Sequence, residues 1–219
     1  MRKHLVLYAA CAAVVIFGQA AVVFAWHDSH ALLLGGEVLG GAFTVVVTCA
    51  AFGDVGKPAR NELVERGFER SWAVILIGLG TDLIASVGFL GLASPNIWDT
   101  ALASADLLMT ATLVFATVDA TISDDAWYLV IPAAIYRSIL VSWRPTVFPR
   151  ALIILAVAYG ADLSLVLALQ QLLQGMHVAE PALWASGVAA ALIIPFVQTF
   201  ATFVYLDAIG FEPERSCSE

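Results

Sequence analysis

Four carboxylate side chains lie inside long apolar stretches of the sequence. They are Glu37, Asp82, Asp106 and Asp162, and no Lys, Arg or His lies in the same stretches to neutralise them. Charge is costly in hydrocarbon, so each acid is a candidate functional residue. Carboxylates without basic partners favour a proton, a cation or a cationic solute, because their hard oxygen atoms suit such ions. The alternative is structural: each acid is protonated and hydrogen-bonds a neighbouring hydroxyl or carbonyl.

Three of these acids lie in similar surroundings. The sequence reads GTDL at 80–83, ADL at 105–107 and GADL at 160–163. This repetition hints at an internal duplication, which would place Asp82 and Asp162 near the middle of a membrane. Transporters built from structural repeats have their binding sites at that depth.

Other polar and small residues suit the same interior. Glu37 lies between Gly36 and Gly40, a spacing that allows two helices to approach closely. The last apolar stretch carries a stripe at helical spacing, made of Pro195, Gln198, Thr202 and Tyr205. Its proline frees a backbone carbonyl that is available to line a cavity.

A second group of candidate ligands lies between the apolar stretches, on the opposite side from the basic residues. Its members are His27, Asp28, His30, His177 and Glu180. Imidazole is the commonest ligand of zinc and copper, so these residues are a candidate metal site. The alternative is a set of solvated histidines, since spacing across loops constrains no geometry. The three cysteines form no CxxC pair, and we expect no cofactor.

The elements that must position these side chains are membrane-spanning helices. Of 219 residues, 61% are hydrophobic and 13% charged, which excludes an ordinary soluble domain. Apolar runs of about 20 residues predict helices that cross a bilayer. We therefore expect one all-α domain over residues 1–219, a helical bundle with spans at about 5–26, 31–52, 71–93, 98–118, 151–173 and 183–206. The first run also resembles a secretory signal, but it is long for one.

The basic residues orient this bundle. Six spans with a cytoplasmic N-terminus place all ten Lys and Arg residues on the cytoplasmic side. This is the expected distribution, because short loops rich in Lys and Arg stay in the cytoplasm. The sequence therefore predicts a multi-pass protein of the inner membrane with both termini in the cytoplasm. The formal net charge of −8 argues against a nucleic-acid partner.

Two further segments are predicted to lie along the cytoplasmic interface. They are residues 61–70 and residues 126–143. The second is apolar enough to be a seventh span, but it is short and carries Pro132 and Arg137 near its middle. We expect its aromatic residues at headgroup depth and Arg137 to contact lipid phosphate.

No enzyme motif identifies a reaction: GxSxG, HExxH, a phosphate loop and a Rossmann fingerprint are all missing. The leading hypothesis is a transporter-like protein that binds a proton, a cation or a small cationic solute at the four acids. The alternative is a non-catalytic subunit or scaffold that contacts other membrane subunits. A lipid-modifying enzyme comes third, because paired aspartates can act as acid and base.

Three short motifs carry a family resemblance. They are FERSW at 68–72, IYRS at 135–138, and the ending with PF at 195–196 and YLD at 205–207. In these the chain resembles uncharacterised six-helix bacterial membrane proteins related to the membrane domain of glycerophosphodiester phosphodiesterases. The resemblance covers residues 68–207 and implies a six-helix bundle, interfacial helices and contact with lipids. It transfers no catalytic residue, and the buried aspartates depart from the pattern.

Overall fold

The described part of the protein is made of helices joined by turns and short loops. The computed structural model describes residues 5–26, 29–55, 65, 69–92, 105, 108–178 and 181–210, and these contain no β-strand. This confirms the all-α prediction. The helices are α1 (Leu5–Trp26), α2 (Ser29–Val55), α4 (Ser71–Leu92), α6 (Ala116–Ile122), α7 (Val130–Ser142), α8 (Phe148–Gly175) and α9 (Pro181–Ile209).

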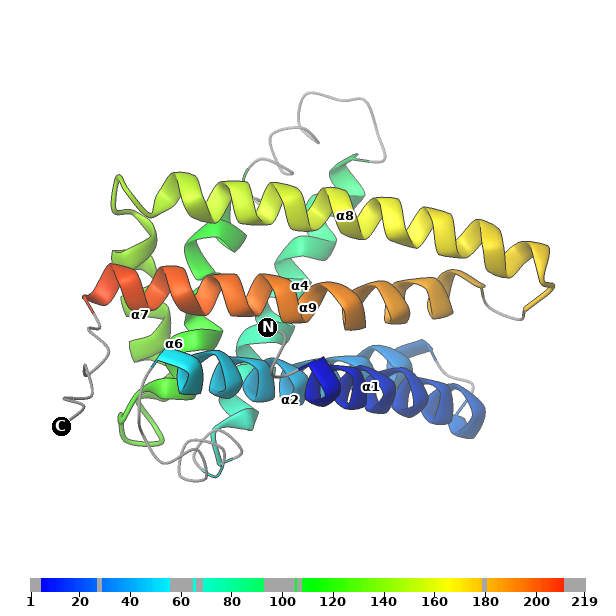
Figure 1. The fold of residues 1–219 in the computed structure, drawn as a ribbon, viewed down its shortest axis with the longest axis horizontal. Helices are drawn as coiled ribbons and strands as arrows, with labels where there is room; N and C mark the ends of the chain where they lie inside the picture. The colour runs from blue at the N-terminus through cyan, green and yellow to red at the C-terminus, as the bar shows by residue number, and fades with distance from the viewer. Residues whose placement is uncertain are drawn as a thin grey trace, which may run out of the picture.

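The long helices α1, α2, α8 and α9 follow the long axis of the molecule (Figure 1). Helix α9 lies between α8 on one side and the α1–α2 pair on the other, and it packs on all three. Helix α4 crosses this layer steeply in the same view, and α6 and α7 pack at one end. That end also holds the start of α8 and the end of α9.

Two of the described helices are long and apolar enough to cross a membrane. They are Phe148–Gly175 and Trp184–Ile209. The predicted run at 5–26 coincides with α1, and the predicted runs at 31–52 and 71–93 lie on α2 and α4. The set of six spans is not confirmed, because α4 crosses the other long helices and the start of the run at 98–118 lies mostly outside the described residues.

The predicted span at 98–118 is interrupted. A helical run over residues 108–113 ends in a turn at Val114 and Phe115, and α6 starts directly after it. The break frees the carbonyl of Thr112, which accepts hydrogen bonds from the hydroxyls of Ser138 (2.7 Å) and Ser142 (2.9 Å). Serines on α7 therefore replace the partner that a continuous helix would supply.

Helix α7 accounts for the predicted interfacial segment at 126–143. It has 13 residues, about 20 Å, which is too short for the ~30 Å hydrocarbon core. This length disfavours a seventh span, and the place of the segment at the interface stays a prediction. The other interfacial segment, 61–70, lies mostly outside the described residues.

Alanines and one glycine allow the helices around α4 to pack closely. One core cluster joins α2, α4, α6 and α7 through small side chains, among them Ala73, Ala116 and Ala134. At Gly41 of α2 a Cβ atom would lie 2.5 Å from the side chain of Ile75 on α4. At Gly40 a Cβ atom would meet only an ordinary contact at 4.0 Å, and the side-chain surroundings of Gly36 lie outside the described part of the chain, so the close approach at this pair stays a prediction.

Candidate functional site

An ion pair between Asp119 and Arg137 occupies the junction of α6 and α7. Arg137 donates from Nε to both carboxylate oxygens, at 3.0 and 2.9 Å, and from Nη2 to Oδ2 at 2.7 Å. The Asp119 side chain is only 5% exposed, whereas that of Arg137 is 36% exposed. The predicted contact of Arg137 with lipid phosphate is wrong, because its guanidinium faces inward to a carboxylate that compensates its charge.

Tyr205 connects this ion pair to α9. Its hydroxyl donates a hydrogen bond to Oδ1 of Asp119, and the whole residue is 2% exposed. The ring of Phe115 lies beside it, with the ring centroids 5.8 Å apart. Asp119 therefore has partners on two different helices, and three elements of the fold meet at one carboxylate.

A second carboxylate shares the same guanidinium. Arg137 also donates to both oxygens of Asp125, with the Nη1 contact at 3.4 Å. This donation lowers the pKa of Asp125 below its ordinary value. The two carboxylates together raise the pKa of Arg137 above its ordinary value, so the guanidinium stays charged. Arg70 donates to the carbonyl of Asp125 at 2.7 Å and to Ser123 at 3.1 Å, which holds the loop in place.

The polar stripe predicted on the last span points into the same interior. Gln198 is buried and donates to the hydroxyls of Thr48 (2.8 Å) and Thr117 (3.3 Å). Thr202, fully buried, donates to the carbonyl of Gln198 at 2.7 Å. The prediction that these residues share one interior face is confirmed, and the face ends at the Tyr205–Asp119 contact.

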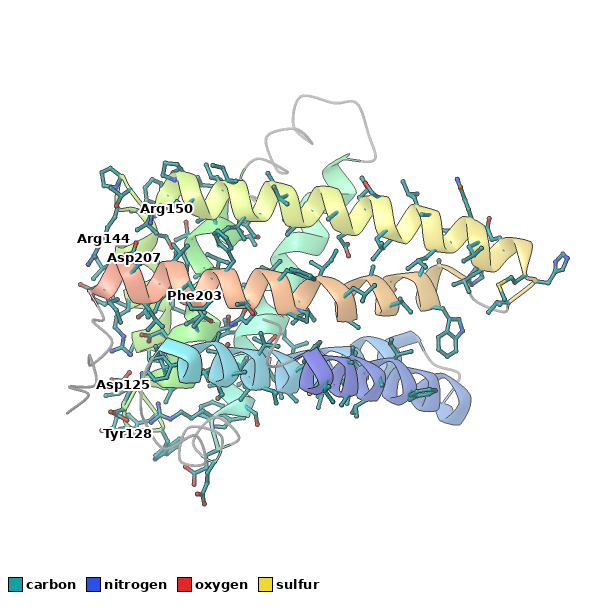
Figure 2. All side chains as sticks on the ribbon, in the orientation of Figure 1. Asp125, Tyr128, Arg144, Arg150, Phe203 and Asp207 are labelled. Atoms are coloured by element: carbon teal, nitrogen blue, oxygen red, sulfur yellow. The ribbon has the colours of Figure 1, made fainter. Side chains whose placement is uncertain are left out.

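The basic residues that the structure describes gather at this end of the molecule. Arg70 and Arg137 contact Asp125, and Arg150 forms an ion pair with Asp207 at 2.8 Å. Arg144 donates to the carbonyl of Ala208 near the end of α9. Figure 2 shows Asp125, Arg144, Arg150 and Asp207 at the same end.

The four acids singled out in the sequence are not brought together by any described contact. Glu37 lies on α2 and Asp82 on α4, but their side chains and the whole of Asp106 lie outside the described residues. Asp162 is half-buried on α8 and makes no hydrogen bond or ion pair with the part of the chain that the structure describes. It lies three helical turns beyond Ala151, which packs in the cluster beside Tyr205.

The candidate metal ligands lie mostly outside the described residues. This applies to His27, Asp28 and Glu180 and to the side chain of His30. His177 is exposed at the end of α8 and has a positive φ of 55°. Among the described residues no group of three potential ligands forms a metal site. The metal site therefore stays a prediction.

Sequence reasoning missed Asp119, which lies one residue beyond the predicted end of a span. The sequence does contain an indication of this pair, because Arg137 lies in an apolar segment. A buried guanidinium is costly without a carboxylate that compensates its charge. The separation of 18 residues follows from α7 turning back onto α6, and only the fold shows this.

Asp125 makes stability depend on pH. Its pKa is lowered in the folded protein, so its ion pair stabilises the fold above the unfolded value of about 3.9. That contribution is lost as the pH falls through the folded pKa. We expect the difference in melting temperature between wild type and Asp125→Asn to be positive at pH 7 and to shrink below about pH 4. A difference that is constant from pH 7 to pH 3 would contradict the assignment.

Comparison with family models, curated proteins and solved structures finds no match for this chain.

Proposed function

We propose that the chain is a multi-pass membrane protein of transporter type, in which Asp119 is the carboxylate that exchanges Arg137 for a proton, a cation or a cationic solute. The observation that carries this proposal is a buried carboxylate whose cationic partner is partly exposed. The end of the molecule that holds Arg70, Arg137, Arg144 and Arg150 faces the cytoplasm, in keeping with the distribution of positive charge in membrane proteins.

The charge balance of the site limits what can bind there. Asp119 and Asp125 contact the guanidinium of Arg137, and Arg70 lies beside Asp125, so the two acids and the two arginines together are neutral when all four are charged. A proton or a monovalent cation would therefore bind at Asp119 in place of Arg137, as an exchange that keeps the balance. Because burial penalises uncompensated charge, such a cation would be favoured at Asp119 whenever Arg137 turns toward Asp125 alone.

A polar path leads from this site into the middle of α9. Tyr205, Thr202 and Gln198 follow one another at about one-turn intervals, and Pro195 continues the same face near the centre of the helix. Thr48 adds a hydroxyl from α2 at 2.8 Å from Gln198. These groups give a proton or a small cation a row of oxygen and amide partners. The acids Glu37, Asp82, Asp106 and Asp162 stay candidates for other parts of this path.

The experiment is a flux measurement with the full chain in liposomes. Internal pyranine reports protons driven by a potassium diffusion potential, and ethidium serves separately as a cationic solute. We expect wild-type flux for at least one probe, and background flux for Asp119→Asn, which removes the exchanging charge and keeps the shape. Glu65→Gln, which changes an exposed acid, is the matched control. Equal flux for wild type and Asp119→Asn, or no wild-type flux for either probe, would refute the proposal.

A scaffold role is the second candidate, and the outer face of α8 favours it. Large apolar side chains on that helix are more than half exposed, for example Leu163 and Leu172. Such a face suits either lipid or a neighbouring subunit. Purification in mild detergent distinguishes these cases, because an obligate subunit would not isolate alone as a monodisperse species.

A further inference from the structure

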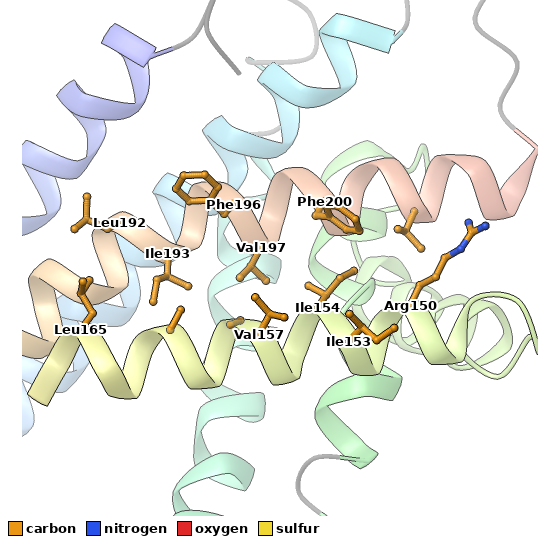
Figure 3. A pocket seen from close by; sticks show the side chains of 13 residues that line it. Arg150, Ile153, Ile154, Val157, Leu165, Leu192, Ile193, Phe196, Val197 and Phe200 are labelled. Atoms are coloured by element: carbon orange, nitrogen blue, oxygen red, sulfur yellow. The ribbon is translucent and has the colours of Figure 1, made fainter.

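An apolar groove runs along the contact between α8 and α9. Its cavity volume is about 880 Å³, within the range of small-molecule sites. Figure 3 shows Leu165 and Val157 of α8 facing Ile193 and Val197 of α9 across it. Arg150 lies at one end and is the only charged residue among the described residues that line it.

The groove has the depth of one leaflet. From Arg150 to Leu165 the helix advances about 22 Å. Half of the hydrocarbon core is about 15 Å thick, and one leaflet with its headgroup layer is about 20 Å thick. Trp143 stacks on Phe148 at the end that holds Arg150, with ring centroids 5.3 Å apart. Tryptophan side chains typically lie at headgroup depth, so Trp143 places Arg150 at the level of lipid phosphates.

The charged end of the groove is available to an anion. Arg150 is paired with Asp207, but the two side chains are 53% and 71% exposed. Exposed ion pairs of this kind contribute little free energy, so the guanidinium can exchange the carboxylate for a phosphate at small cost. Arginine also binds phosphate through two parallel hydrogen bonds. Arg144 lies at the same end and adds positive charge (Figure 2).

We infer that this groove binds an anionic phospholipid of the cytoplasmic leaflet, with one acyl chain between α8 and α9 and the phosphate at Arg150. The inference rests on the membrane topology proposed above. It does not depend on the exchange at Asp119, because the two sites share no residue. Lipid retention and ion flux are measured separately, so each proposal can fail without the other.

Native mass spectrometry of the full chain tests this site. The purified protein is equilibrated in detergent with equal amounts of phosphatidylglycerol and phosphatidylcholine, and bound lipid is counted. We expect wild type to retain phosphatidylglycerol in several-fold preference. Arg150→Gln should abolish the preference, whereas Asp207→Asn should strengthen it by freeing the guanidinium.

Two alanines on α8 allow a matched test of the apolar part of the groove, where the acyl chain would bind. Ala161→Phe fills the groove and should lower retention of both lipids, whereas Ala156→Phe, an exposed position that does not line it, should leave retention unchanged. Equal retention of the two lipids by wild type, or an unchanged preference in Arg150→Gln, would overturn the inference. A lipid-free dimer that Ala161→Phe dissociates would also overturn it, since a second copy would then occupy the groove.

Discussion

Arg137→Met is expected to lower the free energy of unfolding by about 3 kcal/mol or more, because it leaves the buried Asp119 without its cationic partner. The Tyr205 hydroxyl remains, but one neutral donor does not compensate a buried carboxylate. Equilibrium unfolding in mixed micelles measures the loss.

The double variant Asp119→Asn/Arg137→Met separates charge from shape. Removing both charges should recover most of the loss, since replacing a whole buried pair costs far less than breaking it. Arg150→Met is the matched control, because its partner Asp207 is largely exposed and the expected change is at most about 1 kcal/mol. If Arg137→Met is as mild as Arg150→Met, Asp119 does not depend on the ion pair.

Phe115→Ala should have the second largest effect, about 3 kcal/mol of unfolding free energy. The ring is fully buried at the turn before α6, where it packs in the cluster that joins α6 to α7, α8 and α9. Its loss leaves a cavity beside Tyr205 that the turn cannot close without moving α6.

Phe203 on α9 provides the control, because Phe203→Ala removes the same side chain as Phe115→Ala from an exposed position. Phe203 is 41% exposed, so Phe203→Ala should cost about 1 kcal/mol or less. Both variants are compared by the same unfolding measurement. Equal losses would show that the turn at Phe115 is no more tightly packed than the outer face of α9.

Much of the helical framework follows from the sequence. The predicted first run and α1 share the same ends, and α7 falls within the segment predicted at the interface. The interior stripe of α9 was also predictable, because Gln198, Thr202 and Tyr205 recur at helical spacing among apolar residues. These features depend on composition and local periodicity, which the sequence states directly.

The helix break and the ion pair depend on contacts that local patterns do not contain. No proline or glycine occurs at residues 112–116, so nothing in that stretch predicts a turn at Phe115. The turn is accompanied by contacts from α7, whose Ser138 and Ser142 satisfy the freed carbonyl. The same tertiary contact brings Arg137 to Asp119, which in the sequence lies just outside an apolar run.

Proton and ethidium flux through the double variant Asp119→Asn/Arg137→Met is the most direct test of the exchange at Asp119. This variant is expected to fold about as well as wild type, so a loss of flux cannot be attributed to unfolding. We predict that its flux in liposomes falls to the level of protein-free vesicles. Wild-type flux through the folded double variant would show that the Asp119–Arg137 pair is structural and that the transport proposal is wrong.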